Sequence, residues 1–177
     1  MLLCKKIKLE VSTQDAATLE FMQGKCRALY NWWVFKLRNG ERWNFNNAKK
    51  TLKESRKFDP EINAVYGKLL AEVFFRLDKA MQAFFRRVAE GEHKPGFPRV
   101  KPRHQFFTLC YPAMYLQVQG KTLILPTGGG GKWGPKHYSN IVAHLDGGPV
   151  LQIVGGNANL VVESVSPALG LSVIYLF

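Results

Sequence analysis

The feature that most constrains the fold of this chain is an amphipathic stretch that runs into a proline-rich basic segment. Residues 76–103 read RLDKAMQAFFRRVAEGEHKPGFPRVKPR. Prolines at 95, 98 and 102 fix φ and favour extended backbone before them. The sequence therefore predicts a helix that ends near Gly91, followed by a stiff segment, residues 94–103, which we call the strap. The helical part carries apolar side chains at the three- and four-residue spacing of one buried face, namely Leu77, Met81, Phe84, Phe85 and Val88.

Basic side chains accompany both parts of this stretch. At about 100° per residue, the basic residues of the helix fall within an arc of roughly 100° opposite the apolar stripe. The strap adds further cations around one aromatic ring, Phe97. We therefore expect the helix to face a core on one side and a polyanion on the other. The cations are Arg76, Lys79, Arg86 and Arg87 on the helix and Lys94, Arg99, Lys101 and Arg103 on the strap.

The excess of positive charge lies in the first part of the chain. Residues 1–104 hold 22 of the 25 Lys and Arg and 11 of the 13 Asp and Glu, whereas residues 105–177 hold 3 and 2. The sequence pI is near 9.8. Tryptophan and tyrosine residues among the cations favour nucleic acid over a membrane surface, because stacking rings accompany the charge. A basic surface that is only solvated is the alternative.

Periodicity elsewhere predicts an α+β fold. Alternation over residues 5–11 indicates a half-buried strand with Lys6 and Lys8 on its outer face. A long helix is expected from Ser12 or Thr13 to about residue 39, followed by a weakly packed basic helix over residues 44–57. An apolar run from residue 62 is expected to continue as one helix, through Gly67, into the amphipathic stretch.

After residue 104 the pattern changes to short alternating runs that predict antiparallel strands. Turns are expected at Pro112 and Gly120, and the four glycines at 128–131 are interpreted as a flexible linker. The order of elements predicts a small antiparallel β-module with a helical bundle inserted after its first strand. The predicted strands cover residues 106–111, 114–118, 122–125, 140–145, 150–154 and 160–165.

Several motifs, in this order along the chain, resemble the N-terminal region of the TnpB family of insertion-sequence RNA-guided endonucleases, which is related to compact type V CRISPR effectors. The resemblance covers about residues 5–126 and implies a wedge-like barrel that carries an inserted recognition lobe. Residues 1–11 would form the first strand, 12–92 the lobe, 93–127 the strap and returning strands, and 128–177 a Gly-rich, diverged β-type tail. The motifs are residues 26–32, 76–80, 82–87, 94–99, 111–112, 120–121 and 123–126.

The resemblance implies that the lobe and wedge contact guide RNA, the RNA–DNA heteroduplex and a transposon-adjacent motif of target DNA. The positions that match the family pattern are Asn31, Arg76, Lys79, Arg86, Arg87, Arg99 and Lys101. Residue chemistry adds Lys6, Lys8 and Arg103 as phosphate-binding cations and Trp32 and Phe97 as base-stacking rings. Trp43 also lies off the buried stripe and is a stacking candidate, whereas Tyr30 and Trp33 fit the core.

Nothing in the sequence assembles the nuclease centre or zinc ribbon of the resembled family. Two-metal hydrolysis needs several clustered carboxylates, and after the strap only Asp146 and Glu163 remain. The four histidines and three cysteines lack zinc-site spacing and are interpreted as loop or strand residues and reduced thiols. The segment before Lys132 lacks the first glycine and the Ser/Thr of a phosphate-binding loop. We predict no catalytic residue, no metal ligand and no cofactor, and therefore a chain that is not an enzyme.

The leading hypothesis is a nuclease-less module that binds structured guide RNA, DNA or both. One alternative is a helix-turn-helix DNA-binding transposase or regulator fragment. Another is a subunit of a split nuclease completed in trans, whose catalytic partner covers apolar tail residues. Those residues are Leu169, Leu171, Val173, Ile174 and Leu176.

The tail after residue 127 departs from the resembled pattern, and truncation, a frameshift or domain replacement would each produce that departure. The start of the chain is too short for a signal sequence, and no apolar run reaches about 18 residues. We therefore expect a cytoplasmic protein with no membrane partner.

Overall fold

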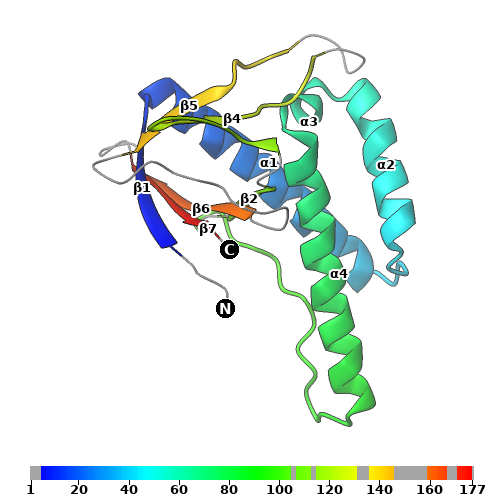
Figure 1. The fold of residues 1–177 in the computed structure, drawn as a ribbon. Coiled ribbons are helices and arrows are strands. Elements are labelled where there is room, and N and C mark those ends of the chain that lie inside the picture. The colour runs from blue at the N-terminus through cyan, green and yellow to red at the C-terminus, as the bar shows by residue number, and fades with distance from the viewer. Residues whose placement is uncertain are drawn as a thin grey trace.

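The computed structural model describes residues 5–104, 107–112, 115–130, 136–145, 159–166 and 171–176, with backbone alone for residues 5–9, 145, 159–166 and 171–176. All four described helices lie between the first and second strands, so the α+β class and the inserted helical bundle are confirmed (Figure 1). In chain order the elements are β1 (Lys5–Val11), α1 (Thr13–Arg38), α2 (Phe45–Phe58), α3 (Pro60–Ala64), α4 (Gly67–Ala89), β2 (Leu109–Pro112), β3 (Gln117–Gln119), β4 (Thr122–Leu125), β5 (Ile141–Leu145), β6 (Asn159–Ser166) and β7 (Leu171–Leu176).

The strands form one antiparallel sheet in the order β2-β6-β7-β1-β5-β4-β3. Among the described strands β2 and β3 occupy the two edges, so this part of the sheet is open rather than a closed barrel. Gly120 turns β3 into β4 with φ of 60°, as predicted. The expectation that Pro112 turns one strand into its neighbour is wrong, because β2 pairs with β6 at the opposite edge from β3.

The tail supplies strands to the interior of this sheet. β7 pairs with β1 from Lys5↔Leu176 to Glu10↔Leu171, and also with β6. The split-nuclease hypothesis assigned Leu171, Val173, Ile174 and Leu176 to a partner surface, and the backbone of these residues is paired on both sides within the chain itself. Leu169 and the strand predicted at residues 150–154 lie outside the described residues.

The helix boundaries follow local capping chemistry. Ser12 caps α1 by accepting a hydrogen bond from the Asp15 N–H, and Gly40, with φ of 90°, follows the helix end. The helix predicted at residues 44–57 is α2, which buries Ala48 and little else among its described side chains. The expected unbroken helix through Gly67 is wrong, because α3 ends at Ala64 and α4 begins at Gly67.

A close backbone approach explains this break. The Gly128 N–H donates a 2.9 Å hydrogen bond to the Ala64 carbonyl oxygen. A Cβ at residue 128 would lie 2.2 Å from the Asn63 carbonyl oxygen and 2.4 Å from that of Val65. The loop after β4 therefore packs directly on the α3–α4 junction, so the interpretation of Gly128 as part of a flexible linker is wrong.

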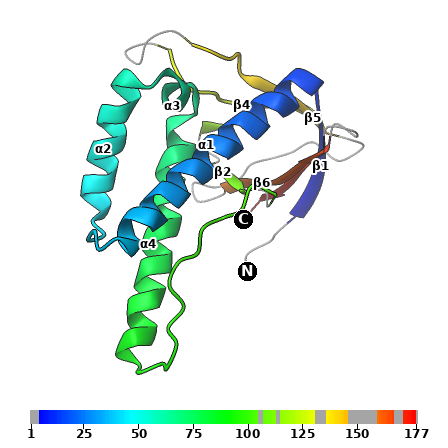
Figure 2. The ribbon, with the colours of Figure 1, turned by 180° about the vertical axis from the view of Figure 1, so that it is seen from behind.

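The core lies where α1 and α4 cross each other over the sheet (Figures 1 and 2). Tyr30 and Trp33 are buried there, as expected. Trp33 meets Phe74 edge to face, with ring centroids 6.3 Å apart. The lower half of α4 extends beyond the other helices, and the strap runs back along it toward β2. None of the described helices combines the length and apolar character needed to cross a membrane.

Two buried thiols make the folded protein less stable as the pH rises into the alkaline range. Burial raises the pKa of the Cys26 thiol from 9.0 to about 12 and that of Cys110 to about 11. Between pH 9 and 12 the Cys26 thiol ionises in the unfolded chain but not in the folded one, so its stabilising contribution falls as pH rises. We expect this thiol alone to lower the free energy of unfolding by on the order of 1 kcal/mol between pH 8 and pH 10.

Urea unfolding of the wild type and of Cys26→Ala at the two pH values measures this effect. The variant should lose less stability than the wild type on going from pH 8 to pH 10. An identical loss in both proteins would contradict the assignment to Cys26.

Candidate nucleic-acid interface

The strap is fixed to the helices through its own carbonyl oxygens. Arg87 Nη2 of α4 donates to the Gly96 carbonyl at 2.7 Å. Three side chains of α1 hold the rest: Arg38 donates to Pro98 at 3.4 Å, Asn31 to Lys101 at 2.8 Å and Arg27 to Arg103 at 3.1 Å. Residues 27, 31 and 38 share one face of a helix at about 100° per residue. This face of α1 therefore binds an extended backbone.

Asn31 makes the tightest of these attachments. Its Nδ2 donates to the Lys101 carbonyl oxygen at 2.8 Å, and its Oδ1 accepts from the Lys101 N–H at 2.7 Å. Both backbone hydrogen-bonding groups of one strap residue are therefore satisfied by one side chain. Asn31 was predicted as a nucleic-acid contact, and the structure places its amide on the strap instead.

Phe97 secures the other end of the strap. Its ring is half-buried and meets Phe84 of α4 edge to face, with centroids 5.1 Å apart. The neighbouring Pro98 is buried. The base-stacking role predicted for Phe97 is therefore replaced by packing against α4.

The attachments described above use backbone atoms of the strap, not its basic side chains. Arg99, Lys101 and Arg103 are exposed. Among the described residues, none forms an ion pair with any of the three. Three exposed positive charges therefore stand at every second residue of a backbone that the helices hold in place.

The predicted basic arc of α4 divides into two parts. Lys79 and Arg86 are exposed on the outer side, where Arg86 makes a 4.0 Å exposed pair with Glu90 that contributes little. Arg76 is half-buried, with its guanidinium 5.2 Å from the Phe107 ring centroid. Arg87 holds Gly96 and lies 3.5 Å from Glu92. Arg76 and Arg87 are therefore structural residues, contrary to the expectation that all four face a polyanion.

The aromatic residues predicted to stack on bases also differ in their surroundings. Trp32 is 43% exposed, and Lys36 Nζ lies 4.5 Å from its ring centroid. Trp43 is packed edge to face on Trp33 and donates from Nε1 to Asp78 Oδ1 at 2.7 Å, so its predicted stacking role is wrong. Lys6 and Lys8 lie in β1 with their backbones paired to β7, and their side chains are outside the described set.

Sequence reasoning missed the roles of Arg27 and Arg38. Both lie on the polar side of the predicted helix. Their spacing places them on the same helix face as Asn31, and this pattern could have indicated that the face binds an extended segment. That partner is the strap rather than a ligand. Within the described residues, no group of three or more His, Cys, Asp or Glu side chains is placed to hold a metal ion.

Replacing Asn31 tests the attachment of the strap. Asn31→Ala removes both hydrogen bonds to Lys101, and we expect a loss of about 1–2 kcal/mol in the free energy of unfolding, with much faster amide exchange at Lys101. Asn31→Asp is the matched control, because it keeps the acceptor for the Lys101 N–H and should retain part of that protection. An unchanged amide-exchange rate at Lys101 in Asn31→Ala would show that the two hydrogen bonds from Asn31 do not fix the strap.

No protein-family model matches this sequence, and no curated protein matches it either.

Proposed function

We propose that this chain is a nucleic-acid-binding module that holds the phosphate backbone of structured RNA along the strap, and that it works in the cytoplasm without a nuclease centre of its own. The observation that carries the proposal is the row of exposed side chains Arg99, Lys101 and Arg103 on a segment that α1 holds through backbone carbonyls. The excess of 25 Lys and Arg over 13 Asp and Glu supports a polyanionic ligand.

Rigidity is the physical reason why this row suits a phosphate backbone. A flexible basic tail loses conformational freedom when it binds, and that loss reduces its affinity. Here prolines at 95, 98 and 102 and four side-chain attachments fix the strap before the ligand arrives. The resemblance to the guide-RNA-binding lobe of TnpB-like proteins agrees with RNA as the first choice of ligand.

Duplex DNA read by a helix-turn-helix is the less supported alternative. A recognition helix must insert into the major groove and present side chains to base edges. The short helix α3 has five residues and buries Asn63 and Ala64, so it has little surface for that purpose. The split-nuclease hypothesis stays an alternative, with residues 171–176 paired inside the sheet through their backbone.

The test is a salt titration of binding to a structured RNA and to a duplex DNA of equal length. We expect tighter binding to RNA and a log–log salt slope of about −3 or steeper, because at least three phosphates are neutralised. Sequencing of nucleic acid that co-purifies with the protein from its host would then identify the ligand. Weak, salt-insensitive binding to both polymers would reject the proposal, and tighter binding to the duplex would favour the alternative.

A further inference from the structure

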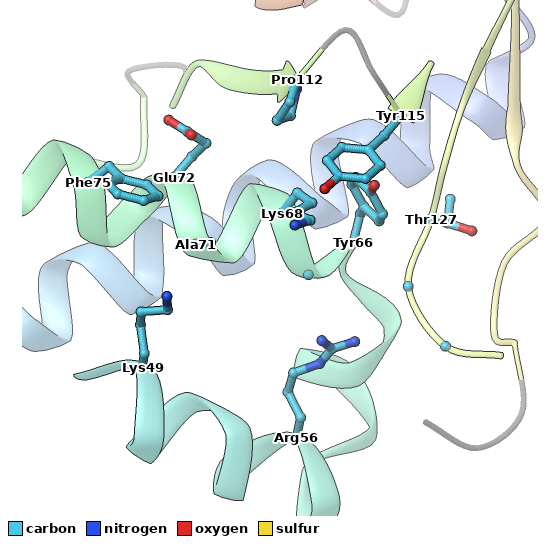
Figure 3. A pocket seen from close by; sticks show the side chains of 13 residues that line it. Lys49, Arg56, Tyr66, Lys68, Ala71, Glu72, Phe75, Pro112, Tyr115 and Thr127 are labelled. Carbon is cyan, nitrogen blue, oxygen red and sulfur yellow. The ribbon is translucent and has the colours of Figure 1, made fainter. Parts of the chain in front are cut away.

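A cavity of about 640 Å³ lies on the opposite side of α4 from α1, and none of the predicted site residues lines it. It is bounded by α2, the first turns of α4, the end of β2 and the loop at residues 127–129 (Figure 3). Cavities of roughly 300–1,000 Å³ hold small organic ligands in other proteins. The size of this cavity therefore suits a group as large as one nucleotide.

Three cations surround the opening of the cavity. Lys49 and Arg56 extend from α2 toward α4, and Lys68 extends from the first turn of α4 (Figure 3). Arg56 donates to Asn63 Oδ1 at 3.3 Å, and a Cβ at Gly67 would lie 2.6 Å from its Nη1. The guanidinium therefore lies directly over the start of α4, where the helix dipole is also positive.

One carboxylate, Glu72, is present among the lining residues and opposes these charges. Burial raises the pKa of Glu72, while Arg76 and Lys79 act in the other direction. Three cations against one acid leave the wall electropositive. The site therefore favours an anion.

Aromatic rings supply the second half of the site. Tyr115 is 38% exposed, and Lys68 Nζ lies 4.6 Å from its ring centroid. Tyr66 meets Tyr115 edge to face at 6.3 Å, and burial raises its pKa to about 12, so its hydroxyl keeps its proton and can donate. A flat ring that stacks on Tyr115 would place an attached phosphate near Lys68 and Arg56.

Two further cations lie along α4 on the same side of the helix as Lys68. Residues 68, 79 and 86 fall within roughly 20° of one another around the helix axis at about 100° per residue. The exposed Lys79 and Arg86 therefore extend the charge of Lys68 along the helix. A nucleic-acid strand on this face would have its phosphates bound beyond the cavity, which favours a nucleotide within a strand over a free one.

We infer that this cavity receives one unstacked nucleotide of a bound RNA, with its base on Tyr115 and its phosphate between Lys68 and Arg56. The inference rests on the proposed function, because the strand must be held elsewhere by phosphate contacts. It adds a preference that the strap cannot provide, since phosphate contacts position a strand and do not distinguish paired from unpaired bases.

The experiment compares two RNA hairpins that differ by one bulged nucleotide. Wild-type protein should bind the bulged hairpin about 10-fold more tightly, because one stacked base contributes about 1–3 kcal/mol. Tyr115→Ala should abolish this preference and leave the affinity for the fully paired hairpin unchanged. Phe35→Ala is the matched control, because it removes another exposed ring, on α1 and away from the cavity. Circular dichroism and the urea midpoint check that each variant is folded.

The outcomes separate the two proposals. Tight, salt-dependent binding of both hairpins without a preference would overturn the inference and leave the proposed function standing. Failure to bind either hairpin would overturn both. A titration with adenosine monophosphate, adenosine and inorganic phosphate gives a third arm. Binding of the monophosphate at micromolar concentration, lost in Tyr115→Ala, without a bulge preference would make the cavity a free-nucleotide site and overturn the strand assignment.

Discussion

Reversing three of the four strap cations together, in R99E/K101E/R103E, is expected to weaken RNA binding on the order of 100-fold at about 100 mM salt. Each lost phosphate contact removes roughly 1 kcal/mol or more of binding free energy and lowers the salt slope by about one. The three side chains are exposed, and the carbonyls of Lys101 and Arg103, rather than the charged groups, attach the strap to α1. The free energy of unfolding should therefore stay within about 0.5 kcal/mol of the wild type.

The control for this variant must carry the same change in net charge. R42E/K50E/K57E serves, because these residues are exposed, lie at or before α2 and are not part of the strap. It should reduce affinity much less and leave the salt slope near that of the wild type. An equal loss in the two triple variants would indicate general attraction to a basic protein and would contradict a role for the strap.

Gly128→Ala is expected to destabilise the protein by about 3 kcal/mol or more, a larger loss than Asn31→Ala should cause. The added Cβ would overlap the carbonyl oxygens of Asn63 and Val65, which are backbone atoms and cannot rotate away. The α3–α4 junction must therefore move, and the hydrogen bond from Gly128 to Ala64 is lost with it. Urea unfolding followed by circular dichroism measures the effect.

The same Gly→Ala substitution at a second glycine is expected to raise the free energy of unfolding, so it is a control for the substitution itself. Gly24 lies within α1, and a Cβ there would meet only Arg27 Nη2, at the ordinary contact distance of 3.9 Å. Gly24→Ala should stabilise the protein by about 0.5–1 kcal/mol, because alanine is the better helix former. If Gly128→Ala unfolds at the same urea concentration as the wild type, the loop after β4 does not pack where the structure places it.

Those parts of the fold that depend on neighbouring residues could be predicted from the sequence. β1 has the predicted bounds, the cap of α1 is Ser12, one of the two predicted candidates, and α2 lies within one residue of its predicted limits. The break before α4 could not be predicted, because it depends on Gly128, more than 60 residues away. The separation of β2 from β3 depends likewise on a partner, β6, that comes later in the chain.

In the candidate interface, too, local features could be predicted from the sequence and contacts between distant residues could not. Exposure of Arg99, Lys101 and Arg103 follows from alternation on an extended segment. Helical spacing placed Arg76 and Arg87 on a polar arc correctly but could not identify the ring or carbonyl that each would meet. The strap attachments use backbone oxygens as acceptors. Every residue has such an oxygen, so the sequence does not show which of them will accept a hydrogen bond. A cavity built from α2, α4 and the loop after β4 is beyond any local pattern.

The position of β1 has a consequence for synthesis on the ribosome. Lys5 is made 171 residues before its partner Leu176. At about 5–20 residues per second, roughly ten to thirty seconds separate the two. The helices can collapse during that interval, while the first strand waits with an open edge that other nascent chains can join. A product released before residue 171 would carry that open edge permanently, so incomplete translation should yield aggregates rather than a smaller working protein.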